Sequence, residues 1–179
     1  MSSSAVPTTK PVLVLVGAPG AGKSSIGRRV ASRLNVPFVD TDQLIENSAG
    51  MSVSDIFVTL GEAEFRRIEQ ETVAGALREQ NGVVALGGGA VMNASTSALL
   101  GEQCVVWLRV NVSDAANRVG MNTARPLLLG NVRGQLKSLM DERTPTYEAV
   151  STYVVDTSGK SLKVVADEVA ALVGGHGND

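Results

Sequence analysis

The fold of this chain is decided by the stretch Val12-Leu-Val-Leu-Val-Gly-Ala-Pro-Gly-Ala-Gly-Lys-Ser24. Its first five residues are a continuous apolar run rich in valine, which is typical of a central strand buried on both faces. The run ends at Gly17, and from Lys23 onward apolar residues recur at helical spacing. The stretch therefore predicts a buried strand, a glycine-rich turn and a helix.

The turn carries a phosphate-binding pattern, because residues 17–24 match G-x-x-x-x-G-K-[ST] in full. Glycines let consecutive backbone N–H groups point at a phosphate, and the helix N-terminus adds partial positive charge. We expect Lys23 to reach the β and γ oxygens of ATP and the Ser24 hydroxyl to ligate Mg²⁺. The residues expected to contact the nucleotide here are Gly20, Ala21, Gly22, Lys23, Ser24 and Ser25. A glycine-rich turn without a ligand is the alternative, and the flanking strand and helix disfavour it.

Outward from this stretch, short apolar runs alternate with helical patterns. Four further strands are expected at residues 38–40, 83–86, 103–110 and 153–155. Helices are expected at 23–34, from Ser52 to about residue 80 with a break at Gly61, after a cap at Ser113, and at 162–173. A polar turn is expected after Asp40, leading into Leu44 and Ile45. This alternation predicts an α/β fold with a mostly parallel sheet.

Length indicates one domain, since 179 residues is an ordinary single-domain size. Residues 1–10 and 175–179 lack an apolar pattern and are expected to be disordered tails around a domain at 11–174. Residues around 120–132 are apolar in places but broken by Pro126 and Gly130, which predicts a mobile lid.

Charge and composition exclude several partners. Sixteen Lys and Arg against eighteen Asp and Glu give a net charge of -2, which does not favour nucleic acid or an anionic membrane. No window approaches the roughly 20 apolar residues that span a bilayer. Cys104 is the only cysteine and is expected to be a buried small hydrophobe, and a single cysteine suits a reducing cytoplasm. No extended apolar stripe is evident, so we expect a monomer.

Two classes of P-loop protein lack their usual signatures here. The chain has no Asn-Lys-x-Asp tetrapeptide, which argues against a GTPase switch. Motor and AAA-type ATPases usually show four apolar residues leading into an aspartate, whereas here residues 83–86 run into glycine and residues 105–108 run into Arg109. Small-molecule kinases remain. They need a phosphate cradle, an acceptor pocket and a cover that keeps water from the γ-phosphoryl group.

The acceptor pocket is expected beyond the carboxyl ends of the strands, where open α/β sheets bind ligands. Asp40 and Asp42 follow the second predicted strand, Gly87–Gly89 follow the third, and Arg66 and Arg67 lie on the long helix between them. We expect Asp42 to accept a hydrogen bond from a substrate hydroxyl and Asp40 to reach Mg²⁺ through water. A solvated turn or a helix cap is the alternative for the two aspartates.

Several blocks of the chain together resemble shikimate kinase, in order and spacing, over about residues 12–172. These blocks are residues 17–28, 38–42, 56–66, 86–90, 125–128 and 143–147. The resemblance implies a P-loop NTPase fold of the nucleoside-monophosphate-kinase type, a three-layer sandwich whose five-stranded parallel sheet has the order 2-3-1-4-5. It also implies ATP-dependent phosphorylation of the 3-hydroxyl of shikimate, in aromatic amino-acid biosynthesis.

The same resemblance implies roles for individual residues of the acceptor pocket. Asp42 would hold the ring hydroxyls and take the proton of the attacking one. Arg66 and Arg143 would grip the shikimate carboxylate, a task that suits the planar guanidinium group. The turn of Gly87, Gly88 and Gly89 would offer backbone N–H groups where a side chain would collide with the substrate.

On the nucleotide side, the resemblance implies that Arg118 stacks on the adenine and that Arg125 swings over the phosphates to offset the charge that develops during transfer. The chain departs from the family pattern near the fifth strand, where the loop at the adenine edge often carries Arg and Pro but here has Lys160, which we expect to substitute as the nucleotide contact. It also departs at Arg109, where an acidic residue is expected.

Two alternatives stay open at this point. A kinase of another small polyol acid, such as gluconate, would keep Lys23 and Ser24 with a different carboxylate clamp. A non-catalytic nucleotide-binding module would respond to ATP without turnover, although the presence of Asp42 and Arg125 argues against it.

Overall fold

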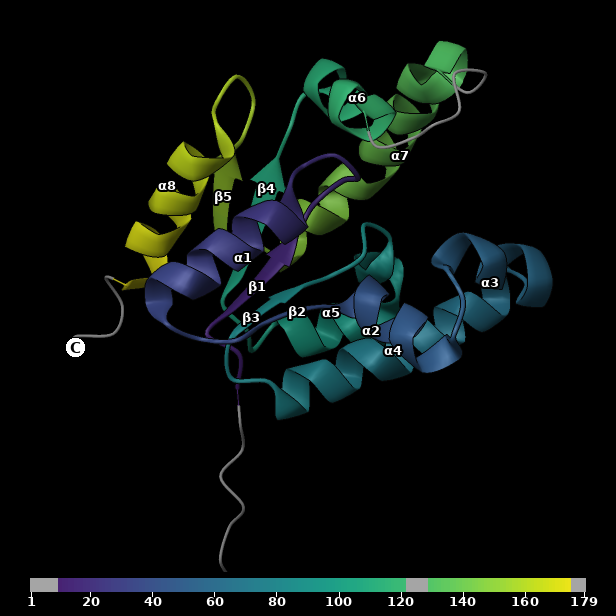
Figure 1. Cartoon of the computed structure of the whole chain (residues 1–179), viewed down its shortest axis with the longest axis horizontal. Coiled ribbons are helices and arrows are strands. Elements are labelled where there is room, and N and C mark those ends of the chain that lie inside the picture. The colour runs from purple at the N-terminus through teal and green to yellow at the C-terminus, as the bar shows by residue number, and fades with distance from the viewer. Residues whose placement is uncertain (1–9, 122–128, 175–179) are drawn as a thin grey trace, which may run out of the picture.

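The computed structural model describes residues 10–121 and 129–174 and has a parallel sheet at its centre (Figure 1). The five strands are β1 (Leu13–Val16), β2 (Phe38–Asp40), β3 (Val83–Ala85), β4 (Val105–Arg109) and β5 (Tyr153–Asp156). Their order across the sheet is β2-β3-β1-β4-β5, and every neighbouring pair is parallel. The predicted fold class and strand order are confirmed.

The central strand β1 is buried along its whole length. Leu13 and Leu15 belong to one apolar cluster and Val14 and Val16 to another, because side chains alternate between the two faces of a strand. Both faces are covered, which explains why this segment reads as a continuous apolar run.

Helices cover both faces and complete the three layers. On one face lie α1 (Lys23–Leu34) and α8 (Leu162–Gly174), and on the other α4 (Glu62–Glu79) and α5 (Ala94–Leu100). Cys104, just before β4, is half-buried rather than fully buried, because it packs at the margin of the first cluster. No helix in the described ranges is long and apolar enough to cross a membrane.

The helices α2 (Thr41–Ala49) and α3 (Val53–Leu60) pack on α4 through a third cluster of Ile45, Ile56 and Phe65. The start of α3 is confirmed, since the Asp55 N–H donates to Ser52 Oγ at 3.1 Å. The polar turn expected after Asp40 and into Leu44 is wrong. Those residues form α2, which the sequence hides because few of its side chains are apolar.

Two more helices, α6 (Val112–Met121) and α7 (Leu129–Val150), follow β4, and a short 3₁₀ turn, η1 (Ala90–Met92), precedes α5. The predicted cap at Ser113 is wrong. The helix begins one residue earlier, and the Asp114 N–H donates to Asn111 Oδ1 at 2.7 Å.

The two ends of the lid predicted around 120–132 are helical, because residues 120–121 are the last of α6 and residues 129–132 are the first of α7. Residues 122–128, with Arg125, lie outside the described residues, as do residues 1–9 and 175–179 of the predicted tails. The domain boundaries and the lid stay predictions.

Candidate active site

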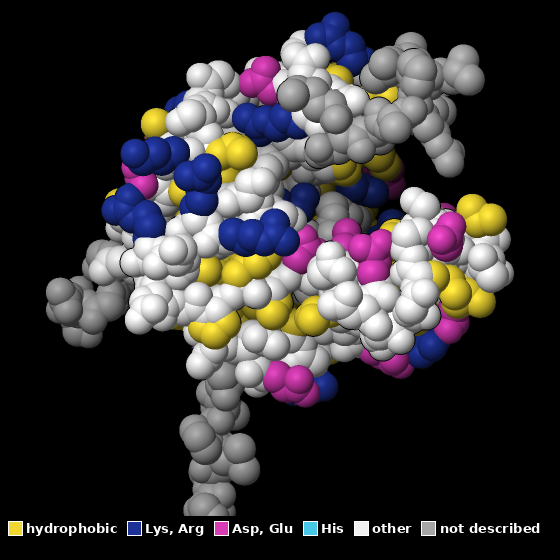
Figure 2. Space-filling model, in the orientation of Figure 1, with side chains coloured by type: hydrophobic (Ala, Val, Ile, Leu, Met, Phe, Trp, Pro, Cys, Tyr) yellow, Lys and Arg dark blue, Asp and Glu magenta, His cyan; other side chains and the backbone are white. Residues whose placement is uncertain are grey.

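A pocket of about 460 Å³ opens at the carboxyl edge of the sheet, and Figure 2 shows a hollow in this face with basic and acidic side chains around it. It joins segments that are far apart in the chain. Its walls are the phosphate loop, two aspartates at the end of β2, the glycine turn after β3 and two residues from α6 and α8. The lining residues are Pro19, Gly20, Gly22, Lys23, Ser24, Ser25, Asp40, Asp42, Leu86, Gly87, Gly88, Arg118 and Leu162.

The phosphate loop has the backbone that its glycines predict. Gly20 and Gly22 have φ values of +83° and +89°, a region that disfavours side chains. A Cβ on Gly20 would also lie 2.5 Å from the carbonyl oxygen of Ala115. Because α1 begins at Lys23, the N-terminus of that helix stands at the loop, as a phosphate site requires.

Lys23 lies inside this loop. Its Nζ donates to the carbonyl oxygens of Gly17 at 2.7 Å and Ala18 at 3.2 Å. Burial lowers the pKa of Lys23 to about 8, and the negative charges of Asp42 and Asp40 oppose that shift. The ammonium is therefore still mostly charged at neutral pH, and ready to exchange carbonyl oxygens for phosphate oxygens.

Ser24 and Asp40 form a pair of oxygen ligands that fits Mg²⁺. Ser24 Oγ donates a short hydrogen bond to Asp40 Oδ2, while Asp40 Oδ1 caps α2 by accepting from the Asp42 N–H at 2.9 Å. Asp40 is thus both a helix cap and a neighbour of the phosphate loop. No group of three or more metal-binding side chains occurs in the described part of the chain. A cation here would complete its shell with phosphate and water oxygens, which is how Mg²⁺ binds in kinases.

Asp42 has the properties of a base poised in the pocket. Its Oδ1 is buried and has no hydrogen-bond partner within the described structure. The pKa of Asp42 is raised to about 6, first by burial and then by the charges of Asp40 and Glu69, and the charge of Lys23 opposes this shift. A Cβ on Gly87 would lie 2.6 Å from this Oδ1, so the glycine leaves room for the carboxylate. A buried unpaired oxygen is costly, which points to a ligand as its partner.

The two arginines predicted to grip a carboxylate converge on the glycine turn. A Cβ on Gly89 would lie 2.8 Å from both Nη1 and Nη2 of Arg66, and 3.0 Å from Nη2 of Arg143. A Cβ on Gly88 would lie 3.1 Å from Arg143 Nη1. Arg66 comes from α4 and Arg143 from α7, so the fold brings both guanidinium groups to one place. Such a pair suits a carboxylate, which accepts parallel hydrogen bonds.

Sequence reasoning missed two residues of this region. Glu69 on α4 is 3% exposed, and its Oε1 accepts from Arg66 Nη1 at 2.8 Å. Tyr147 on α7 is also buried, and its hydroxyl donates to the carbonyl oxygen of Gly88 at 2.6 Å. The three-residue spacing of Arg66 and Glu69 along a helix was the available signal for the first. For Tyr147 it was the block that it shares with Arg143.

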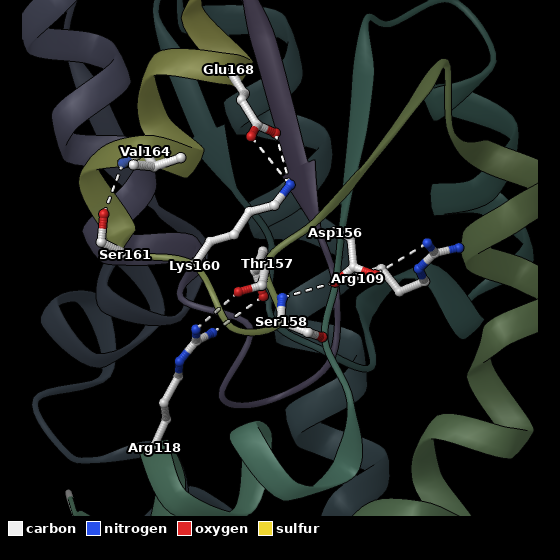
Figure 3. A network of polar contacts seen from close by, with 9 residues as sticks. All are labelled: Arg109, Arg118, Asp156, Thr157, Ser158, Lys160, Ser161, Val164 and Glu168. Atoms are coloured by element: carbon white, nitrogen blue, oxygen red, sulfur yellow. Dashed lines mark hydrogen bonds and ion pairs between the residues drawn. The ribbon is translucent and has the colours of Figure 1, made fainter.

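At the other end of the pocket, Arg118 of α6 contacts the phosphate loop and the segment after β5, and Figure 3 shows its contacts with Thr157 of that segment. Its Nη1 donates to the carbonyl oxygen of Gly20 at 3.1 Å and to Thr157 Oγ1 at 3.3 Å, and its Nη2 to the carbonyl oxygen of Thr157 at 3.4 Å. Arg118 and Leu162 line the pocket beside the phosphate loop, where the base of a bound nucleotide would extend.

The two departures from the family pattern lie near this end. Lys160 Nζ pairs with Glu168 Oε1 at 3.1 Å, and Lys160 is not among the lining residues (Figure 3). Its predicted adenine contact stays a prediction. Arg109 Nη2 pairs with Asp156 Oδ2 at 3.2 Å, directly across β4 and β5. A cross-strand ion pair thus accounts for the basic residue at 109.

A phosphate loop with an activated carboxylate and an arginine pair in reach defines a class of protein, the P-loop kinases of small acidic acceptors. Comparison with known proteins then gives the family. The shikimate kinase family model matches residues 19–173. The chain belongs to the shikimate kinase family, and it is an ATP-dependent kinase that transfers phosphate to shikimate.

Individual relatives agree with this assignment. The chain is 52% identical to a shikimate kinase of Thermobifida fusca over 163 residues, which cover 91% of this chain and 95% of that one. It is 47% identical to a shikimate kinase of Mycobacterium tuberculosis over 160 residues, which cover 89% and 91%. A solved structure of an Acinetobacter baumannii shikimate kinase in complex with shikimate superimposes with a TM-score of 0.87 at 30% identity, over 99% of this chain and 100% of that one.

A gluconokinase shares the fold of this chain, and this likeness carries no information about the acceptor. A gluconokinase of Sinorhizobium meliloti superimposes with a TM-score of 0.57 at 22% identity, covering 93% of this chain and 92% of that one. Both proteins share the layered architecture, and the family match separates them.

Proposed function

We propose that this chain uses ATP and Mg²⁺ to phosphorylate the 3-hydroxyl of shikimate, giving shikimate 3-phosphate for aromatic amino-acid biosynthesis, with the residues named above in the roles that follow. The observation that carries the proposal is the buried, unpartnered Oδ1 of Asp42, which lines the same pocket as the phosphate loop and adjoins the glycine turn where Arg66 and Arg143 converge.

The phosphate loop binds the triphosphate through backbone N–H groups and the start of α1. Lys23 releases its two loop carbonyls to bind the β and γ oxygens. Ser24 and Asp40 would hold Mg²⁺, which when bound offsets phosphate charge. Arg118 and Leu162, which line the pocket, flank the base. The family resemblance assigns Arg125 the role of offsetting the charge on the phosphates during transfer.

The acceptor end positions the alcohol and receives its proton. The 3-hydroxyl oxygen attacks the γ-phosphorus, the bond from that phosphorus to the β–γ bridging oxygen breaks, ADP leaves, and the hydroxyl proton passes to Asp42. A pKa of about 6 leaves Asp42 ionised at neutral pH yet basic enough to help. Arg66 and Arg143 hold the carboxylate of shikimate, with backbone N–H groups of the glycine turn beside it.

A coupled assay for ADP with shikimate or gluconate as the acceptor tests the proposal. We expect turnover with shikimate only, and the acceptor assignment is wrong if shikimate does no better than background ATP hydrolysis. Arg66→Lys tests the clamp, because an ammonium cannot replace the guanidinium fork. It should raise the shikimate KM roughly tenfold or more, by the loss of about 1.4 kcal/mol or more of binding, and leave the ATP KM nearly unchanged.

The monomeric state and the cytoplasmic location stay predictions from the sequence. Gel filtration with light scattering checks the first, and cell fractionation checks the second.

A further inference from the structure

The acceptor clamp, formed by Arg66 and Arg143, lies beside a buried tyrosine that has no role in the phosphotransfer scheme above. Tyr147 lies on α7, four residues after Arg143, and is 1% exposed. Its hydroxyl donates to the carbonyl oxygen of Gly88 at 2.6 Å, from an element that is distant from the glycine turn in the chain. We infer that Tyr147 is a positioning residue for the acceptor, an inference that rests on the function proposed above.

The hydrogen bond to Gly88 orients more than one atom. The carbonyl of Gly88 and the N–H of Gly89 belong to one planar peptide unit and point in opposite directions. Holding the carbonyl toward Tyr147 therefore turns the Gly89 N–H away from it. Glycine has many accessible backbone conformations, so three in a row need an outside contact to stay in one of them. Thr41 supplies one such contact, since its Oγ1 accepts from the Gly87 N–H at 3.3 Å, and Tyr147 supplies another at Gly88, where Arg66 and Arg143 converge.

The same hydroxyl is close to the clamp arginine. Burial raises the pKa of Tyr147, and the charge of Arg143 opposes this shift, as does a hydrogen bond between the two side chains. The phenol thus stays protonated near neutral pH and keeps its donor for Gly88. The hydroxyl of Tyr147 donates to Gly88, and the guanidinium group of Arg143 lies beside the same glycine, so loss of the hydroxyl affects both the turn and Arg143.

The ring of Tyr147 is held independently of its hydroxyl. It stacks on Trp107 of β4 with ring centroids 5.7 Å apart and an interplanar angle of 27°. Trp107 is 6% exposed and is the only tryptophan of the chain. Removal of the hydroxyl alone leaves this packing in place. It also means that the fluorescence of Trp107 reports on the ring beside the acceptor site.

Tyr147→Phe is the test, with Tyr153→Phe as the matched control. Tyr153 is the only other tyrosine, and it begins β5, whereas the acceptor site lies beyond the carboxyl ends of the strands. We expect Tyr147→Phe to raise the shikimate KM roughly threefold to tenfold, as the loss of one buried hydrogen bond predicts, with the ATP KM within about twofold. The control should leave both KM values within about twofold.

Two further measurements make the outcome decisive. The unliganded variant should melt within a few degrees of the wild type, and its shikimate titration, followed by Trp107 fluorescence, should weaken by the same factor as the KM. Equal changes in both KM values, no change in either, or a large loss of melting temperature with an unchanged ratio of KM values would overturn the inference. Turnover of shikimate by the wild type is measured first, so that a failure of the proposed function is recognised separately.

Discussion

The two ends of the active site are built in different ways. The phosphate end is a contiguous segment, residues 17–25, whose shape is set by backbone conformation and by the start of one helix. The acceptor end is assembled from α2, α4, α7 and the glycine turn after β3, and its shape is set by side chains. A site made of backbone is encoded locally, whereas a site made of side chains depends on the whole fold.

Burial also acts on the two ends in opposite directions. It lowers the pKa of Lys23 to about 8 and raises that of Asp42 to about 6, and each charge partly offsets the shift of the other. At pH 7 both groups are charged in an environment that disfavours charge. The two buried charges therefore lower the stability of the fold, and their shifted pKa values suit proton and phosphoryl transfer. Active sites commonly combine such a loss of stability with function.

The largest expected effect separates chemistry from binding at the acceptor end. Asp42→Asn removes the proton acceptor and keeps the shape of the side chain. We expect kcat to fall roughly 10²- to 10⁴-fold, the range for loss of a general base, with the ATP Kd within about threefold. Stopped-flow or coupled assays with calorimetry for ATP check this. A variant that keeps wild-type kcat would show that Asp42 takes no proton.

The corresponding change at the phosphate end is Lys23→Ala. Removing a charge that stabilises the transferring phosphoryl group should lower kcat roughly 10²- to 10³-fold. Shikimate binding, measured by Trp107 fluorescence without nucleotide, should change by less than about threefold. An equal loss of shikimate affinity would contradict the division into two ends, because Lys23 would then also shape the acceptor end.

Burial of the ionised Asp42 carboxylate should lower the free energy of unfolding. A raised pKa in the folded state means that ionisation of Asp42 disfavours folding, so its contribution is most favourable below the unfolded pKa and is lost as pH rises through about 6. At pH 8 the free energy of unfolding of Asp42→Asn should therefore exceed that of the wild type, by about 3 kcal/mol at most. Near pH 4 the two free energies should differ little. Urea titrations at both pH values check this. A difference independent of pH would mean that packing, not charge, is responsible.

The contrast between the two ends also explains what the sequence revealed. The strands were predictable because β1 and its neighbours are apolar runs, and the phosphate loop because its glycines and Lys23 are adjacent. The partner of Arg109 was not, since Asp156 faces it only through the register of β4 and β5. Nor was α2, whose start depends on a cap at Asp40. Arg66 was a candidate from its position between the second and third strands, but its pairing with Arg143 came from a family resemblance, because no local pattern indicates that the two meet.

A smaller effect comes from adding one methyl group at the acceptor end. Gly89 has φ of -97°, which alanine adopts without strain. The new Cβ would meet the ends of Arg66 and Arg143, which are flexible and move aside at little cost in stability. Displacement of the clamp by about 1 Å should raise the shikimate KM roughly ten- to hundredfold.

The control for Gly89→Ala is Gly75→Ala on α4, where the added Cβ meets nothing within 4 Å. It should stabilise the helix by up to about 1 kcal/mol and leave both KM values unchanged. If Gly89→Ala unfolds the protein, or leaves the shikimate KM unchanged, the two arginines do not form the clamp.

The smallest expected effect tests whether the clamp needs its buried counter-charge. Glu69→Gln keeps an oxygen for Arg66 Nη1 but removes the charge that strengthens this 2.8 Å contact. The amide oxygen still accepts from the charged guanidinium group, but the attraction between opposite charges is lost, which costs about 1 kcal/mol, so the shikimate KM should rise roughly fivefold. Since the charge of Glu69 also raises the pKa of Asp42, its removal should move the acidic limb of the kcat profile to lower pH.

Glu71→Gln is the matched control, because Glu71 forms a similar pair with Arg67 on the same helix but is 70% exposed. Water screens such a pair, so its loss should change neither KM nor the pH profile. If both glutamine variants behave alike, burial of Glu69 has no bearing on the acceptor. If Glu69→Gln moves the acidic limb to higher pH, the carboxylate of Glu69 does not repel that of Asp42. The acceptor end would then be organised by Arg66 and Arg143 alone, and its dependence on the surrounding fold would be weaker than its geometry indicates.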